Sequence, residues 1–98
     1  MKKTFLLKVI CEAALEETLA EEVEKAGGGG YTAHSVRGRG SHGKRSAAME
    51  EDRNILFQVI GSRDLIDRLA KSLEENFFKN YAMVLYIHEV EVLRSEKF

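Results

Sequence analysis

Cysteine is scarce in this sequence, with Cys11 the only one among 98 residues. A single cysteine excludes an internal disulfide, and no cysteine or histidine pair has the spacing of a zinc site. The histidines, His34, His42 and His88, are far apart in the chain, and a lone histidine in a strand is more often a packing residue than a ligand. We therefore predict no metal, a reducing compartment, and a Cys11 that packs as a small hydrophobic residue.

A long hydrophobic segment is also missing. The start of the chain resembles a secretion signal, but Lys8 and Glu12 interrupt its apolar run before a signal core is complete. No later run is long enough to cross a membrane. These features favour a cytoplasmic protein.

Acidic residues are absent from segment 27–45, which holds seven of the eight glycines and four of the fifteen basic residues. Without those four cations, 11 basic residues face 16 acidic ones (15 − 4 = 11), so the positive charge of the chain is local. A nucleic-acid binder usually spreads its basic residues over a face, because affinity grows with the number of phosphates neutralised. The pattern therefore favours a small anion as the ligand.

Two kinds of residue in this segment suit an anion, glycines that expose backbone N–H groups and cationic side chains: Gly38, Gly40, Gly43, Arg37, Arg39, Lys44 and Arg45. Arginine can donate two parallel hydrogen bonds to one oxyanion, and lysine adds a mobile point charge. We predict a loop that binds phosphate or another small oxyanion. The alternative is a solvated hairpin tip that has no ligand.

Hydrophobic periodicity divides the chain into six elements, and its length predicts a single domain over residues 1–98. The elements are expected as strand 4–11, helix 12–26, strand 31–36, strand 54–60, a helix after the N-cap Ser62 that ends between residues 76 and 80, and strand 82–93. The order βαββαβ predicts an α+β, ferredoxin-like fold. In this fold a four-stranded antiparallel sheet carries both helices on one face.

Large apolar residues also alternate onto the sheet face that the helices would leave open. We assign six to it: Leu6, Ile10, Leu56, Ile60, Leu85 and Ile87. A monomer of this size does not normally expose so much apolar surface. The pattern predicts a symmetric oligomer assembled through the open face.

Three stretches resemble a known family. They are Gly30-Tyr31-Thr32 before the basic glycine-rich loop, Arg39-Gly40-Ser41 inside it, and the run 77–93, which reads FFKNYAMVLYIHEVEVL. Over nearly its whole length the chain resembles the PII signal-transduction superfamily, and within it the SbtB-type and carboxysome-associated PII-like proteins. The resemblance implies a homotrimer that binds adenine nucleotides in clefts between subunits. It also implies a T-loop, here residues 37–53, through which the protein signals to a partner.

The sequence departs from typical PII proteins at two places. A Gly-Asp-Gly-Lys phosphate loop is replaced by residues 76–81, and the T-loop contains no tyrosine. These departures argue against nitrogen sensing through ATP and 2-oxoglutarate. The resemblance then points to the carboxysome-associated branch, and it implies a non-enzymatic regulator that binds AMP or ADP and bicarbonate. Its expected partner is a bicarbonate transporter or a carboxysome-associated protein.

The resemblance also suggests roles for individual residues. Gly38, Arg39, Gly40 and Ser41 are expected to wrap the nucleotide phosphates, and Lys44 and Arg45 to reach the terminal phosphate or bicarbonate. Adenine is expected to rest on Phe57 and Ile87, while the last strand reads the purine at His88 and Glu89.

Other functions stay open at this point. The protein could be an ATP/ADP energy sensor or a cyclic-AMP-binding SbtB-like regulator. It could also be an RNA-binding ferredoxin-like module, although the predicted open face is mainly aliphatic and the aromatic RNA-binding motif is missing. An acylphosphatase-like enzyme would need an anion cradle after the first strand, where Glu12-Ala13-Ala14 is acidic and has no glycine.

Overall fold

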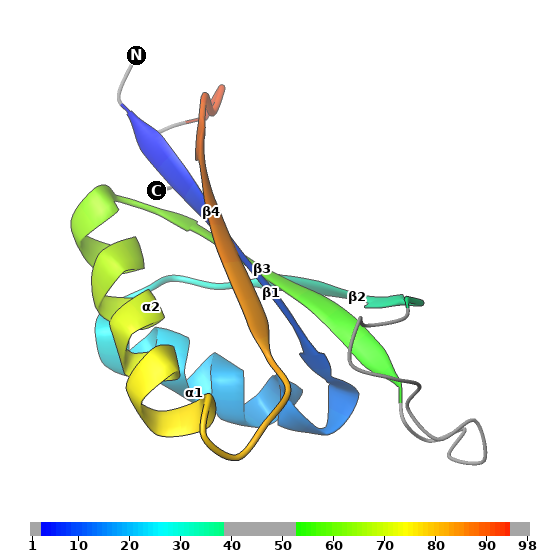
Figure 1. The fold of residues 1–98 in the computed structure, drawn as a ribbon. Helices are drawn as coiled ribbons and strands as arrows, with labels where there is room; N and C mark the ends of the chain where they lie inside the picture. The colour runs from blue at the N-terminus through cyan, green and yellow to red at the C-terminus, as the bar shows by residue number, and fades with distance from the viewer. Residues whose placement is uncertain (1–2, 39–52, 95–98) are drawn as a thin grey trace.

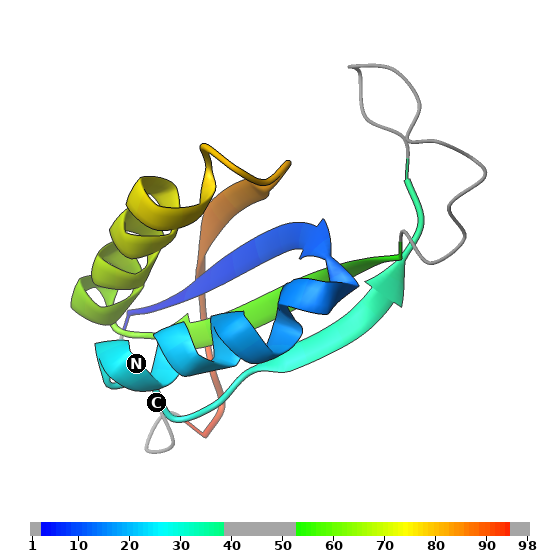
Figure 2. The same cartoon turned by 90° about the horizontal axis from the view of Figure 1, so that it is seen from below.

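The computed structural model describes residues 3–38 and 53–94. The described elements are β1 (Thr4–Glu12), a 3₁₀ turn (Ala13–Leu15), α1 (Glu16–Ala26), β2 (Thr32–Val36), β3 (Asn54–Gly61), α2 (Arg63–Phe77) and β4 (Val84–Val90). The strands form one sheet in the order β2-β3-β1-β4, and every neighbouring pair is antiparallel. Both helices lie on one side of this sheet (Figures 1 and 2). The predicted βαββαβ, ferredoxin-like fold is therefore confirmed.

The helix α1 begins later than the sequence indicated. Residue Glu12 belongs to β1, and the chain then makes the 3₁₀ turn before α1 starts at Glu16. The physical reason is a hydrogen bond from Ala13 N to Arg53 O (2.8 Å), which continues the contact with β3 past the end of β1. The prediction of a helix from residue 12 was therefore wrong by about one turn.

The end of α1 follows the predicted glycine stop. Gly27 has φ 94°, a left-handed conformation that glycine adopts without steric cost. Its N–H bonds to Glu24 O (3.0 Å), and the N–H of Gly28 bonds to Val23 O (2.9 Å), so both bonds satisfy carbonyls of the last turn.

The helix α2 begins at its predicted cap. The Ser62 hydroxyl accepts a hydrogen bond from Leu65 N at 3.1 Å. The buried stripe of α2 consists of Ile66, Leu69, Leu73 and Phe77. Two polar contacts join the helices, from Arg68 to Ala26 O (3.0 Å) and from Ser72 Oγ to Glu22 Oε1 (2.8 Å).

The core lies between the helices and one face of the sheet. Its buried members are Leu7, Val9, Cys11, Leu15, Leu19, Val23, Ile55, Phe57, Val59, Ile66, Leu69, Leu73, Phe77 and Met83. Alternate residues of β1 and β3 point into it, as the period of two requires. The opposite face of the sheet carries no helix and therefore lies on the outside of the subunit.

The register of β4 corrects the predicted open face. Leu85 pairs with Val9 and Ile87 pairs with Leu7, so both lie on the helix-covered face. Val84, Tyr86 and His88 take the open face instead, opposite Ile10, Lys8 and Leu6. The assignment of Leu85 and Ile87 was wrong because alternation alone does not fix which face of a strand points inward when both faces carry apolar residues.

Candidate functional site

Residues 37, 38 and 53 are the described ends of the predicted T-loop; they lie at one end of the sheet, and we call them the loop base. Val36, the last residue of β2, pairs with Asn54, the first of β3, and Asn54 pairs with Glu12 on the other side. The Ala13–Arg53 hydrogen bond holds the same corner. The two ends of the loop therefore leave the sheet from neighbouring strands that are fixed by pairing.

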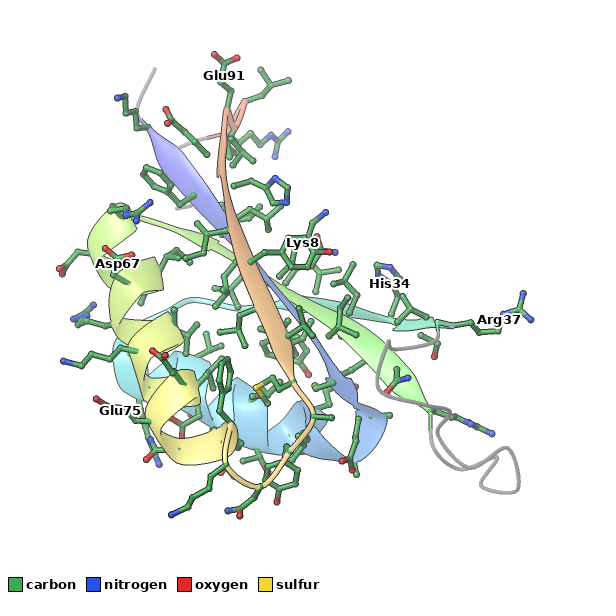
Figure 3. The ribbon with its side chains drawn as sticks, viewed as in Figure 1. Lys8, His34, Arg37, Asp67, Glu75 and Glu91 are labelled. Carbon is green, nitrogen blue, oxygen red and sulfur yellow. The ribbon has the colours of Figure 1, made fainter. Side chains whose placement is uncertain are left out.

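Two guanidinium groups stand at this base. Arg37 and Arg53 are both exposed, and Figure 3 shows Arg37 extending away from the end of β2. Gly38 is exposed as well, and a Cβ added there would meet no atom within 4 Å. The described part of the loop thus presents cations and an accessible backbone, as an anion site requires. Arg37 is one of the predicted cations of the anion loop. Arg53 was not predicted, although its position at the other end of the same loop in the sequence could have indicated it.

The remaining predicted phosphate and bicarbonate ligands are Arg39, Gly40, Ser41, Lys44 and Arg45. They lie outside the described residues. Of the predicted loop ligands, the structure places Gly38.

Phe57 is placed in the core. Its side chain is 1% exposed, and its ring stacks on Tyr31 with centroids 4.5 Å apart and planes at 17°. A base can stack on a ring only where one face of the ring is open to the ligand. In the subunit Phe57 has no such face.

Ile87, His88 and Glu89 lie on β4, the edge strand. Their side chains alternate, so His88 shares the open face with Leu6, whereas Ile87 and Glu89 lie on the other side. Ile87 is 37% exposed on this edge strand. An aliphatic surface is thus available to a ligand here.

The loop base and this part of β4 are far apart within one subunit. Six residues separate the row that contains Glu12 from the row that contains Leu6 and His88, which is about 20 Å along the strands. Three strand spacings separate β2 from β4, which is about 14 Å across the sheet. A single subunit therefore does not bring Gly38 together with Ile87, His88 and Glu89.

The connection from α2 to β4 adds residues that were not predicted as ligands. Asn80 N and Tyr81 N both donate to Phe77 O, at 3.1 and 3.0 Å, and this turn leaves Phe78 and Tyr81 exposed beside Lys79. β4 then starts opposite Ile10, near the end of β1 that also holds the loop base. Lys79 is therefore a further cation at this end of the subunit.

A hollow of about 320 Å³ lies between the outer side of α1 and the segment Gly28–Tyr31. Glu17, Glu21 and Glu24 line it. Carboxylates repel phosphate at short range. This hollow is therefore unsuited to an anionic ligand, and the loop base is the better candidate.

Among the described residues, Cys11 and Tyr31 have raised pKa values, and both side chains have structural roles. Burial, with smaller effects of Glu12 and Glu16, raises the pKa of the Cys11 thiol to about 11. Tyr31 Oη donates to Glu16 Oε2 at 3.0 Å, and this bond raises the pKa of the phenol. Cys11 therefore stays a neutral thiol near pH 7 and packs in the core. A nucleophilic cysteine would instead be a thiolate at a partly exposed site.

Burial of Cys11 makes stability fall at alkaline pH. The folded thiol holds its proton up to about pH 11, whereas the unfolded thiol loses it near 9.0, so the unfolded state binds fewer protons between these values. We expect this group to remove roughly 2 to 3 kcal/mol of unfolding free energy as pH rises from 9 to 11. Urea unfolding at fixed protein concentration should show the fall in the wild type and a shallower one in Cys11→Ala. Parallel curves for the two proteins would contradict this assignment.

No group of three or more metal-ligating side chains occurs within residues 3–38 and 53–94. In the same ranges, no helix is long and apolar enough to span a membrane.

Comparison with known proteins identifies the family. The family model of nitrogen regulatory protein P-II matches residues 4–97. A PII-like signalling protein from Thermus thermophilus is 38% identical, with a TM-score of 0.84 over 98% of this chain and 95% of that chain. CPII from Thiomonas intermedia K12, a nitrogen regulatory PII-like protein solved with ADP, AMP and bicarbonate, is 28% identical, with a TM-score of 0.85 over 99% of this chain and 94% of that chain.

A more distant structure shares the fold alone. GlnK of B. subtilis is 14% identical and has a TM-score of 0.68 over 92% of this chain and 87% of that chain. The family match spans all the described strands and helices, and the relatives are matched over nearly their whole length. This chain belongs to the P-II family and is one of its PII-like members.

Proposed function

We propose that this chain forms a homotrimeric, non-enzymatic signalling protein that binds AMP or ADP, together with bicarbonate, in clefts between subunits. The T-loop transmits the bound state to a bicarbonate transporter or a carboxysome-associated protein, and so regulates inorganic-carbon metabolism. The observation that carries the proposal is the similarity to CPII, which was solved with ADP, AMP and bicarbonate and matches 99% of this chain.

The chemistry of the T-loop supports an anionic ligand. Gly38 and Gly40 allow the backbone to approach phosphate closely, and Ser41 adds a hydroxyl donor. Arg39, Lys44 and Arg45 supply the charge. Bicarbonate next to a nucleotide phosphate would be repelled unless several cations offset the two negative charges, and this loop has them.

The distances within the subunit support a site made by two chains. The loop base and the part of β4 at Ile87, His88 and Glu89 are about 20 Å apart along the strands, so one ligand reaches both only if a neighbouring subunit supplies one of them. β2 and β4 are also the two edges of the sheet, and each carries backbone groups that can pair with another chain.

The open face supports the trimer. Leu6, Ile10, Leu56 and Ile60 are half-buried on it, and Val84 is 56% exposed. A neighbouring subunit would remove this apolar surface from water. RNA is less well supported as the occupant, because Tyr86 is the only Phe, Tyr or Trp on the open face of the described strands.

The adenine position follows from accessibility. Ile87 offers exposed aliphatic surface, and the neighbouring backbone of edge strand β4 at His88 and Glu89 has hydrogen-bonding groups for the purine edge. Phe57 is left out of this site because its ring is buried under Tyr31.

Calorimetry tests the proposal. We expect ADP and AMP to bind without turnover, and ADP to bind several-fold more tightly when bicarbonate is present, since coupling between two ligands is reciprocal. Chloride at the same ionic strength is the control, and ATP and cyclic AMP complete the panel. Preference for cyclic AMP or ATP would replace the proposed ligand, independence of ADP and bicarbonate would remove bicarbonate, and no binding of any adenylate would overturn the proposal.

A further inference from the structure

Among its described residues, the open face of the sheet carries one lysine and one glutamate. Its described members are Thr4, Leu6, Lys8, Ile10, Glu12, Thr32, His34, Val36, Asn54, Leu56, Gln58, Ile60, Val84, Tyr86, His88 and Val90. Lys8 and Glu12 are the lysine and the glutamate among them. Figure 3 shows Lys8 and His34 on this side, whereas Asp67 and Glu75 project from α2. The helices therefore carry much of the acidic surface, and the open face is electrically balanced.

Lys8 has a place on this face but no carboxylate partner among the described residues. It is half-buried, and its Nζ lies 5.8 Å from the centroid of the Tyr86 ring. None of the ion pairs of the described chain includes it. A cation–π contact of this kind holds the side chain over the sheet without neutralising its charge.

Glu12 lies next to an acceptor that has no donor among the described residues. It pairs directly with Asn54 across β1 and β3. Asn54 Oδ1 is buried and has no hydrogen-bond partner within the described part of the chain. Glu12 forms no ion pair within residues 3–38 and 53–94. Two acceptors thus converge at one corner of the open face, and neither has a side-chain donor within residues 3–38 and 53–94.

Lys8 of the same subunit cannot serve this corner. It lies four residues before Glu12 on the same face of β1, about 13 Å away along the strand. When another copy covers the open face, both charges leave water, and an unpaired buried charge is strongly destabilising. When two copies meet, the lysine of one copy can donate hydrogen bonds to the two acceptors of the other, so that these groups are paired across the interface.

We propose that, in the homotrimer, Lys8 of one copy donates to the Glu12 carboxylate and to Asn54 Oδ1 of a neighbouring copy. This inference rests on the trimer proposed above and deepens it. Because Asn54 pairs with Val36 and follows Arg53, the contact joins the central strand of one subunit to the T-loop base of the next. Assembly then fixes the platform from which the T-loop leaves.

Sedimentation over a range of protein concentrations tests the contact. Lys8→Glu and Glu12→Lys should each raise the trimer dissociation constant by about tenfold or more, because each places two like charges at the interface. The double reversal Lys8→Glu/Glu12→Lys should recover to within a few-fold of the wild type. Lys71→Glu and Glu75→Lys are the controls, because Lys71 and Glu75 lie on the exposed side of α2 and belong to no ion pair of the described chain. They make the same charge changes away from the open face and should have no effect.

The outcomes separate this contact from the trimer itself. A wild-type protein that sediments as a monomer overturns the trimer and the contact together. A wild-type trimer whose double reversal is as weak as the two single changes combined overturns the contact alone. If circular dichroism shows that a reversal variant is unfolded, the neutral cycle of Lys8→Met, Glu12→Gln and both together replaces it, and additivity in that cycle overturns the contact.

Discussion

Arg39→Ala is expected to weaken ADP binding by about 10- to 100-fold. In the proposed site Arg39 donates two charge-assisted hydrogen bonds to the phosphates, and loss of such an interaction costs about 1.5 to 3 kcal/mol. Arg45→Ala should weaken the response to bicarbonate more than it weakens ADP binding, since Arg45 is assigned to the terminal phosphate or bicarbonate. Calorimetry with ADP, with and without bicarbonate, measures both effects.

Two further variants make the test specific. Arg39→Lys keeps the charge but loses the planar fork, so an intermediate affinity is expected if geometry matters as well as charge. Lys71→Ala removes a cation from the exposed surface of α2 and should leave ADP affinity unchanged. An Arg39→Ala protein that binds ADP like the Lys71→Ala control would remove Arg39 from the site and would favour a T-loop that is only a solvated surface.

The fold could be predicted from sequence because its local signals agree. Strict alternation in β1 and β3, the Ser62 cap of α2 and the Gly27 stop of α1 each depend on residues close together in the chain. The errors arose where distant residues decide. The start of α1 depends on a bond from Ala13 to Arg53, 40 positions later, and the faces of β4 depend on its register with β1.

The candidate site was less predictable than the fold. A glycine-rich basic segment indicates an anion from its composition alone, because charge and backbone access are local properties. Whether a strand residue faces a ligand or the core is a tertiary property. Phe57 and Ile87 look alike in the sequence as apolar strand residues, yet one is 1% and the other 37% exposed. Periodicity could not predict the proposed position of this site between subunits, since such a site depends on the surfaces of two chains.

Phe57→Ala is expected to lower the unfolding free energy by about 3 to 5 kcal/mol. The ring is buried in the centre of the core, and its removal leaves a cavity and also takes the stacking partner from Tyr31. Phe57→Leu keeps most of the apolar volume, so a loss of about 1 to 2 kcal/mol is expected. Urea unfolding of the variants and the wild type, at one protein concentration, measures these differences.

The same substitution decides between packing and adenine binding for this residue. If Phe57 acts only in the core, it does not contact the ligand, and Phe57→Leu should bind ADP within about twofold of the wild type. A twofold change in affinity corresponds to less than about 0.5 kcal/mol. Ile87→Ala is the matched comparison: its side chain is partly exposed on β4, so it should cost less stability than Phe57→Ala and yet weaken ADP binding more than Phe57→Leu does. The reverse order of affinities, with Phe57→Leu the weaker binder, would return adenine to Phe57 and require the Tyr31 ring to move off it when the nucleotide binds.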